Sequence, residues 1–393
     1  MAEQLKMLTG QLLKTRTPDK REKFVLDDFE GFTDESRKSI RDGVLFLTKM
    51  PLTLSLFKSK NPGKVRIIPF LLTICIVIIT QTFSSGCARK ANKEIFIFKA
   101  GHVANTDHTW HKALEYFSDI LFERSNGKII VKVFPNEQLG KEIELIRSIK
   151  TGIADMTITG GSLQNWTDIV GFSDMPFIFR DSVHMKKLVD GPIGKEMEKR
   201  ILEETGIRIV TYFIRGPRYL TSNRPITGPD DLNGLIVRVP NVPSYTVAWS
   251  ALGANPTPMA LSEVFTSLQQ GTIEAQENPL AMISSTNLYE VQDYVNLTAH
   301  VLSWAYVVIG EKQFQDMPPD LQEIFMEAVK NMQDYEHQLF QENQSKLRDQ
   351  LESKGMEFIE VDVPSFRQMG SGAVYQSLSE EMKDIYNRIV AIE

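Results

Sequence analysis

The chain has 393 residues, of which 42% are hydrophobic, 24% charged and 9% aromatic; this length suffices for two α/β lobes, and the composition argues against a disordered, collagen-like or disulfide-rich protein. The formal net charge of −6 is uneven, because the region after Cys87 carries 30 basic against 41 acidic residues. Nucleic-acid binding needs a basic surface, so the acidic body argues against that class of partner.

The first predicted segment is an uncharged apolar run over residues 67–83. Lysines and arginines precede it, and no acidic residue lies between positions 51 and 87. A basic flank, an apolar stretch and then Ser84-Ser85-Gly86-Cys87 is the pattern of a secretory signal with a small-residue cleavage site. Cys87 directly after Gly86 resembles the lipobox of bacterial lipoproteins, in which the cysteine is lipidated, although Ser84 stands where the lipobox usually carries Leu.

We therefore expect residues 50–87 to be a signal or lipoprotein segment, and the mature protein to be extracytoplasmic and membrane-anchored, in the periplasm or on the outer face of the cell membrane. The anchor is a lipid on Cys87 or an uncleaved signal anchor; plain cleavage is the alternative. The apolar run is short and contains Pro69, whereas a spanning helix needs about 20 apolar residues.

Residues 1–49 do not fit the start of a signal, because they are polar and mixed in charge. Met50 stands directly before the basic flank. We expect translation to begin there, which makes residues 1–49 a mis-called extension; a genuine cytoplasmic tail is the alternative.

Strands and helices alternate from residue 94 onward. Strands are indicated by alternating or continuous apolar residues, and helices by apolar residues at a spacing of three and four. The predicted strands are 94–99, 129–134 and 154–159, and the predicted helices are 110–121 and 143–149. This alternation predicts an α/β fold with a parallel, doubly wound sheet.

The second half repeats this pattern. The predicted strands are 207–213, 219–222, 235–239 and 356–361, with an apolar run at 306–309 and helices at 257–270, 318–354 and the C-terminus. The helix at 318–354 has about 35 residues and would extend roughly 50 Å. We expect it to span both lobes, because that length exceeds one lobe.

Two arginines stand out by their surroundings. Arg238 is the only charge in an otherwise apolar strand, and Arg218 directly precedes another strand. An unpaired buried charge costs several kcal/mol, so each arginine needs a partner. That partner is either an internal carboxylate or a ligand carboxylate, which the planar guanidinium can bind through two hydrogen bonds; an exposed strand face would remove the need.

Sequence motifs of catalysis are missing. The chain contains no glycine-rich phosphate loop, no G-x-S-x-G elbow and no kinase signature, and both of its cysteines lie at the apolar run. We therefore expect neither an enzyme nor a metal or cofactor site.

Four motifs, in the order given, resemble the substrate-binding subunits of TRAP (tripartite ATP-independent periplasmic) transporters, and within them the DctP family. They are Arg238-Val-Pro-Asn, Gly253-Ala-Asn-Pro-Thr-Pro-Met-Ala260, Ser262-Glu-Val-Phe265 and Gln276-Glu-Asn-Pro279. The resemblance extends from about Glu94 to about Ile389. It implies a two-lobed, periplasmic-binding-protein-like fold with crossing strands and a long helix spanning both lobes.

The resemblance also implies the lobe boundaries and the partners. Residues 94–215 with 304–343 would form lobe I, and residues 216–303 with 344–393 would form lobe II. The expected partners are a small organic-acid ligand and the small and large membrane subunits of a TRAP permease.

In this family the arginine of the Arg-Val-Pro strand grips the ligand carboxylate, and Arg238 occupies that position. Further contacts implied by matching positions or by the expected mouth of the cleft are Arg218, Asn278, Asn105, Asn165 and Trp166. Tyr245 could offer an apolar face to a sugar ring or pack in the core. Relatives that bind sialic acid carry a Glu and a Phe where this chain has Gly160-Gly161 and Leu261, which disfavours sialic acid.

The ligand that we favour is a uronate or a related sugar acid. The alternative is a C4-dicarboxylate or 2-oxo acid, whose second acidic group would use Arg215 or Arg218. Two other classes stay open: a surface enzyme acting on acidic sugars, for which no acid–base pair is found, and a sensor subunit that presents its ligand to a membrane receptor.

Overall fold

The structure is a computed structural model, and it describes residues 94–393. The predictions for residues 1–49, for the segment 50–87 and for Cys87 lie outside the described residues. Within the described residues, no helix is both long enough and apolar enough to cross a membrane.

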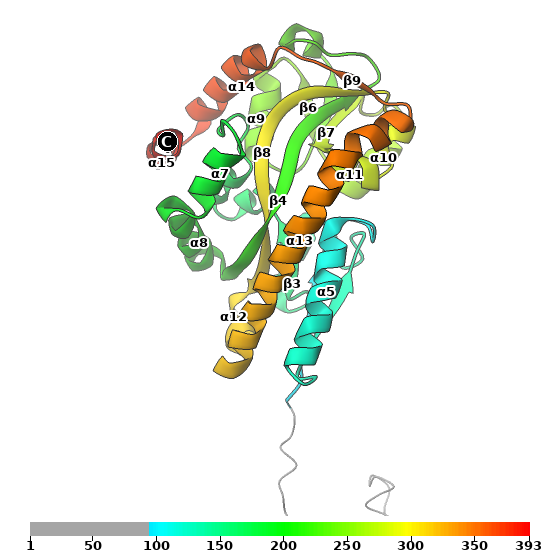
Figure 1. Cartoon of the computed structure of the whole chain (residues 1–393). Coiled ribbons are helices and arrows are strands. Elements are labelled where there is room, and N and C mark those ends of the chain that lie inside the picture. Colours follow the sequence, from blue (N-terminus) through cyan, green and yellow to red (C-terminus); the bar gives the residue numbers. More distant parts are fainter. Residues whose placement is uncertain (1–93) are drawn as a thin grey trace, which may run out of the picture. The chain divides into compact units, whose positions relative to one another are not determined.

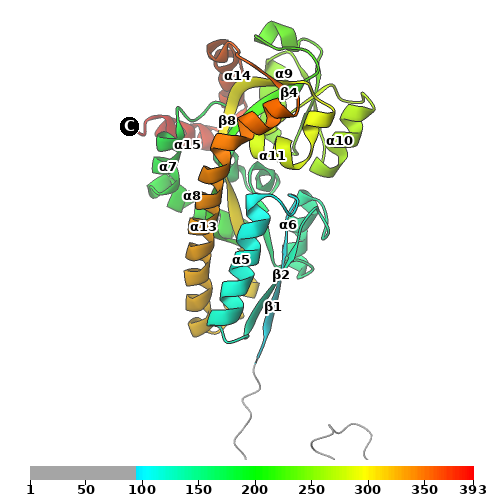
Figure 2. The same cartoon turned by 45° about the vertical axis from the view of Figure 1, so that its right-hand side comes forward.

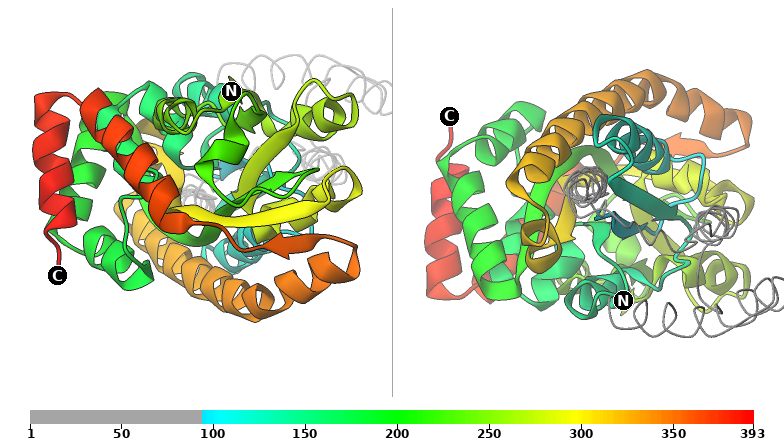
Figure 3. Two further views of the ribbon diagram at one scale, coloured as in Figure 1. Left: turned by 90° about the horizontal axis from the view of Figure 1, so that it is seen from above. Right: turned by 90° about the horizontal axis from the view of Figure 1, so that it is seen from below.

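One continuous sheet runs through the described part, with helices packed on it. The strand order is β2-β1-β3-β8-β4-β7-β5-β6, and β9 pairs with β8. We call the part built on β1, β2 and β3 lobe I, and the part built on β5, β6 and β7 lobe II. Figure 3 shows the two groups of strands from above and below.

Lobe I begins with the predicted strand–helix alternation. Its elements are β1 (Phe96–Gly101), α5 (Thr109–Arg124), β2 (Ile129–Phe134), α6 (Glu142–Thr151) and β3 (Met156–Thr159). The strands pair in parallel, β1 with β2 and β1 with β3. Helix α5 forms as predicted because Ala113, Leu114, Phe117 and Leu121 recur on one face, where they are buried against the sheet.

A group of short helices follows β3. They are η1 (Gly161–Asn165), η2 (Asp168–Ser173), α7 (Ser182–Val189) and α8 (Pro192–Thr205). Their apolar residues share one core with the C-terminal helix α15 (Glu380–Val390), to which Ile385 and Ile389 contribute. This core joins residues near 200, which were assigned to lobe I, to residues near 390, which were assigned to lobe II. The predicted lobe boundaries stay a prediction.

Two long strands connect the lobes. β4 (Ile207–Ser222) and β8 (Tyr294–Gly310) pair antiparallel along most of their length, and Figure 1 shows them curving together through the molecule. The separate strands predicted at 207–213 and 219–222 are thus wrong as separate elements. The register shifts between Arg215 and Arg218, where Pro217 lacks the N–H that a regular ladder requires.

Lobe II repeats the parallel pattern. Its elements are η3 (Pro229–Leu232), β5 (Ile236–Val239), α9 (Pro243–Ala251), β6 (Asn255–Pro258), α10 (Leu261–Gln269), β7 (Ala275–Pro279), α11 (Leu280–Ser285) and η4 (Leu288–Glu290). The helix predicted at 257–270 begins later, at Leu261, because residues 255–258 extend as the edge strand β6. Pro256 and Pro258 fit an edge strand, which can do without their N–H groups.

The predicted long helix is present. α13 (Pro319–Ser353) has 35 residues, follows α12 (Glu311–Gln315), and precedes β9 (Glu357–Ile359) and α14 (Val363–Ser377). It packs against α5 of lobe I and α11 of lobe II, and Figures 1 and 2 show it passing both lobes. The predicted two-lobed α/β fold with crossing strands and a bracing helix is therefore confirmed. The sheet is parallel within each lobe and antiparallel where β3, β8, β4 and β7 meet.

Candidate ligand-binding site

Arg238 lies in the middle of β5, between Thr257 of β6 and Gln276 of β7. Its side chain is only 3% exposed. Nε and one terminal nitrogen both donate to the Met259 carbonyl oxygen, at 3.0 and 2.6 Å. No carboxylate of residues 94–393 forms an ion pair with Arg238. The acceptor of its hydrogen bonds is the neutral Met259 carbonyl, although a buried cation could also bind a negatively charged acceptor.

Two adjoining cavities meet at Arg238. The larger has a volume of about 330 Å³, and the smaller has about 50 Å³; Arg238, Glu142, Ser162 and Leu261 line both. Small-molecule sites have volumes of about 300–1,000 Å³, so the larger cavity fits a compact ligand. The smaller cavity reaches the crossing strands, where Arg215 and Arg218 also line it.

The walls of the larger cavity come from both lobes. Lobe I supplies the loop after β2 and the start of α6, and lobe II supplies the ends of β5 and β6. Two contacts hold the lobes together at its rim: Lys141 donates to the Glu263 carboxylate at 2.7 Å, and Asn165 donates to the Asn241 carbonyl at 2.9 Å. The cavity is therefore a cleft between two lobes in contact, located at the carboxyl ends of parallel strands.

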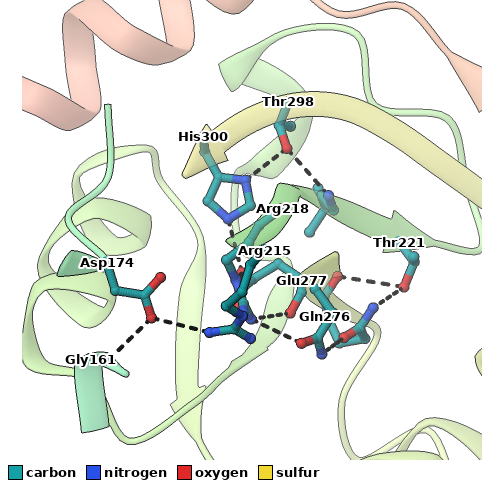
Figure 4. A network of polar contacts seen from close by, with 11 residues as sticks. Gly161, Asp174, Arg215, Arg218, Thr221, Gln276, Glu277, Thr298 and His300 are labelled. Atoms are coloured by element: carbon teal, nitrogen blue, oxygen red, sulfur yellow. Dashed lines mark hydrogen bonds and ion pairs between the residues drawn. The ribbon is translucent and has the colours of Figure 1, made fainter. Parts of the chain in front are cut away.

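Arg218 has an internal partner, unlike Arg238. It forms a two-point ion pair with the buried Glu277, and one of its terminal nitrogens also donates to Asn278 Oδ1 at 3.1 Å. His300 Nε2 lies 2.9 Å from Glu277 Oε2, as Figure 4 shows. Burial alone would raise the pKa of Glu277, but Arg218 and His300 outweigh it and lower the pKa to about 2. The internal carboxylate considered for Arg218 is therefore present in the fold, and its role at a ligand stays a prediction.

Arg215 is the third cation at the smaller cavity. Its guanidinium lies 3.6 Å from Asp174 Oδ2 and 5.6 Å from the Trp110 ring centroid. The same carboxylate oxygen accepts from the Gly161 amide at 3.3 Å, and Figure 4 shows Asp174 between the two groups. A Cβ on Gly161 would meet Asp174 Cβ and Val242 Cγ1 at 3.0 Å, so residue 161 is closely packed between these two side chains.

The structure brings four of the predicted site residues to the cavities. Arg238, Arg218 and Asn278 line the smaller cavity, and Arg238 and Asn165 line the larger one. Asn278 Nδ2 donates to Gln276 Oε1 at 2.6 Å. As ligand contacts these residues stay predictions.

Three predicted residues do not line these cavities. Asn105 donates instead to the Ser285 carbonyl at 2.6 Å, and Trp166 packs on the core near the Arg147 guanidinium. Tyr245 is fully buried, with its ring 5.4 Å from the Arg218 guanidinium, which is the core packing named as its alternative. Their roles at a ligand stay predictions, and each side chain already has a place in the fold.

Sequence reasoning missed several cavity residues. Glu142 and Val103 line both cavities, and Lys141 and Asn241 line the larger one. A signal was present, because each follows the end of a predicted parallel strand, where crevices of such sheets form. Only the fold shows which residues of those loops face inward.

Comparison with known proteins gives consistent matches. The model of the DctP family, "Bacterial extracellular solute-binding protein, family 7", matches residues 100–388. A solute-binding protein of Roseobacter denitrificans is 48% identical over 287 residues, which are 73% of this chain and 88% of that protein. The 2,3-diketo-L-gulonate-binding periplasmic protein of Escherichia coli is 34% identical over 66% of this chain and 79% of its own length.

Solved structures agree with this assignment. A TRAP periplasmic solute-binding protein of Roseobacter denitrificans, crystallised with bound L-galactonate, has a TM-score of 0.74 and 47% identity, covering 76% of this chain and 99% of that one. One from Xanthobacter autotrophicus, with bound β-D-galacturonate, has a TM-score of 0.72 and 30% identity, covering 75% and 100%. The chain belongs to the DctP family of bacterial extracellular solute-binding proteins, as its motifs predicted, and it is the solute-binding subunit of a TRAP transporter rather than an enzyme.

Proposed function

We propose that this protein binds a sugar acid in the cleft between its lobes, with Arg238 holding the ligand carboxylate, and delivers it to the membrane subunits of its TRAP transporter. The observation that carries the proposal is the guanidinium of Arg238, which is buried beside a cavity and bonded to one carbonyl oxygen. A ligand carboxylate would supply the missing counter-charge through two parallel hydrogen bonds.

The remaining walls suit a ligand rich in hydroxyl groups. Polar groups that can form hydrogen bonds line the larger cavity. They are the carboxylate of Glu142, the side-chain amide of Asn165 and the backbone of Asn241. We propose Asn165 and Asn278 as further polar contacts, because they line the cavities that Arg238 joins. The acids bound in related structures, L-galactonate and galacturonate, combine one carboxylate with several hydroxyls.

A thermal-shift screen tests the proposal, since a ligand that binds only the folded state raises the melting temperature. Aldonates and uronates should give the largest shifts, and C4-dicarboxylates and 2-oxo acids should give smaller ones. The Arg238→Ala variant should lose the shift. Shifts with dicarboxylates alone would overturn the sugar-acid assignment, and a shift that survives in Arg238→Ala would overturn the role of Arg238.

We further propose that the mature protein is anchored to the membrane through a lipid on Cys87. The support is the pattern of a basic flank, an apolar run and Ser84-Ser85-Gly86-Cys87. Intact mass of the native protein should give a chain that begins at Cys87 and carries added acyl groups. A Cys87→Ser variant should be recovered without the lipid, and an unmodified Cys87 would contradict the proposal.

A further inference from the structure

The carboxylate of Glu142 faces the same cavities as Arg238, from the opposite lobe. Glu142 is the first residue of α6 in lobe I, whereas Arg238 lies in β5 of lobe II, and both line the larger and the smaller cavity. No ion pair joins them within the described part of the chain. Their charges nevertheless interact, because the Glu142 carboxylate favours the charged form of Arg238. The two opposite charges thus line a shared space without forming an ion pair across it.

Only one oxygen of Glu142 is engaged by the described chain. Oε1 accepts from the Thr159 hydroxyl at 2.7 Å and lies 3.5 Å from the Gly160 amide nitrogen, which fixes the carboxylate between α6 and the end of β3. Oε2 has no hydrogen bond to another residue of 94–393. An ionised carboxylate only accepts hydrogen bonds, so Oε2 can receive a hydroxyl and would repel an anion.

The other charges of the larger cavity do not remove this asymmetry. Lys141 is paired with Glu263, and Glu137 and Glu144 add two more carboxylates to the lining. Arg147 is exposed at the rim, with its guanidinium 5.9 Å from the Trp166 ring centroid. The rival arrangement is a second ligand carboxylate held by Arg147.

We propose that Glu142 determines specificity by accepting hydroxyl groups of a monocarboxylic sugar acid and rejecting ligands that carry a second carboxylate. This inference rests on the proposed function, and it names the substrate class within it: polyhydroxy acids with one carboxylate. Like charges brought together in a binding site are strongly unfavourable, which makes rejection as important as attraction.

A matched pair of ligands tests it. L-Galactonate and galactarate share one carbon skeleton. One end of L-galactonate is a CH₂OH group, and the same end of galactarate is a second carboxylate. Calorimetry on the purified protein should give an affinity for L-galactonate that exceeds the affinity for galactarate by about tenfold or more. Equal or tighter binding of galactarate by the unaltered protein would overturn the inference without any variant.

The Glu142→Gln variant keeps the size of the side chain and removes its charge. It should lower the galactonate-to-galactarate affinity ratio by about tenfold, whereas Glu142→Asp, which keeps the charge, should stay closer to the original ratio. Glu323→Gln, an exposed residue of α13 outside the cavities, is the control for loss of one negative charge and should leave the ratio unchanged.

The outcomes separate the inference from the function on which it rests. A ratio that is unchanged in Glu142→Gln, while Arg238→Ala abolishes binding of both acids, overturns the inference and leaves the proposed function standing. Tight galactarate binding that is lost in Arg147→Ala supports the rival arrangement and also overturns the inference. If the unaltered protein binds no sugar acid, the proposed function fails and the inference fails with it.

Discussion

Arg218 and Arg238 are buried to the same degree in neighbouring parts of one sheet, at 2% and 3% exposure, yet their surroundings differ. Arg218 meets Glu277 from the adjacent strand β7, whereas Arg238, among residues 94–393, donates only to the Met259 carbonyl. Burial lowers the pKa of Arg238 to about 10, while the Glu277 carboxylate outweighs burial at Arg218 and raises its pKa. Arg218 is thus paired within the fold, whereas Arg238 has no carboxylate partner among residues 94–393.

The difference shows that two equally buried arginines of one sheet can differ in whether the described chain supplies a counter-charge. A buried ion pair that is fully hydrogen-bonded stays intact without ligand. A buried cation that lacks a counter-charge raises the free energy of the empty protein, and a carboxylate ligand removes that cost. Changes that exchange or delete these partners therefore test whether the counter-charge explains the difference between the two arginines.

The largest effect is expected at Glu277. Glu277→Ala leaves Arg218 buried without its counter-charge and removes the partner of His300 Nε2, and should lower the free energy of unfolding by about 3–5 kcal/mol. Urea denaturation measures it. A loss below about 1 kcal/mol, as expected for a surface pair, would contradict the structural role of the pair.

The acid dependence of stability checks the same pair. The pKa of Glu277 is lowered to about 2 from an ordinary value of 4.5, so its stabilisation is present above about pH 4.5 and is lost as the pH falls through 2. Glu277→Ala should flatten this acid limb of the denaturation curve. If the free energy of unfolding falls equally steeply at low pH in the unaltered protein and in Glu277→Ala, other carboxylates are responsible for the acid dependence.

The next effect is on binding at Arg238. Arg238→Ala should weaken sugar-acid binding by about two to four orders of magnitude, and Arg238→Lys should also weaken it, because lysine keeps the charge and loses the planar fork. Folding stability should fall less than in Glu277→Ala, since no internal ion pair is broken. Calorimetry with both variants measures the effect, and unchanged affinity in both would reject the role of Arg238.

A smaller effect is expected at Glu336 of α13, a buried carboxyl that forms no ion pair within the described part of the chain. Oε1 accepts from the Thr109 hydroxyl at 2.8 Å, Oε2 has no partner among the described residues, and burial raises the pKa to about 8. The fold therefore favours the protonated form, and this stabilisation is lost as the pH rises from about 4.5 through 8. Glu336→Gln should be more stable than the unaltered protein at pH 9, by about 1–3 kcal/mol in urea denaturation. An identical pH dependence in both proteins would contradict this.

The smallest effect is expected for an exposed pair. Arg348 and Glu352 lie four residues apart on α13 with side chains 52% and 44% exposed. Glu352→Ala should change the free energy of unfolding by no more than about 0.5 kcal/mol, because water screens such pairs. A loss comparable to that of Glu277→Ala would mean that burial does not explain the difference between the pairs.

Features that depend on neighbours along the chain could be predicted from the sequence. The strand–helix alternation of lobe I, the 35-residue helix α13 and the apolar strand around Arg238 follow from local periodicity, and the four motifs placed the chain in its family. Local patterns suffice for such features because one face of each element must be apolar to be buried.

Contacts between side chains that are distant in the sequence became visible only in the folded structure. Glu277 is the partner of Arg218 across 59 positions of the chain, and Glu142 reaches the cavity of Arg238 from the other lobe. Asn105 donates to the Ser285 carbonyl, and the Tyr245 ring lies near the Arg218 guanidinium; the two residues of each pair are far apart along the chain. Neither the single long strand β4 nor these pairings could be predicted, since they depend on how distant segments align across the sheet.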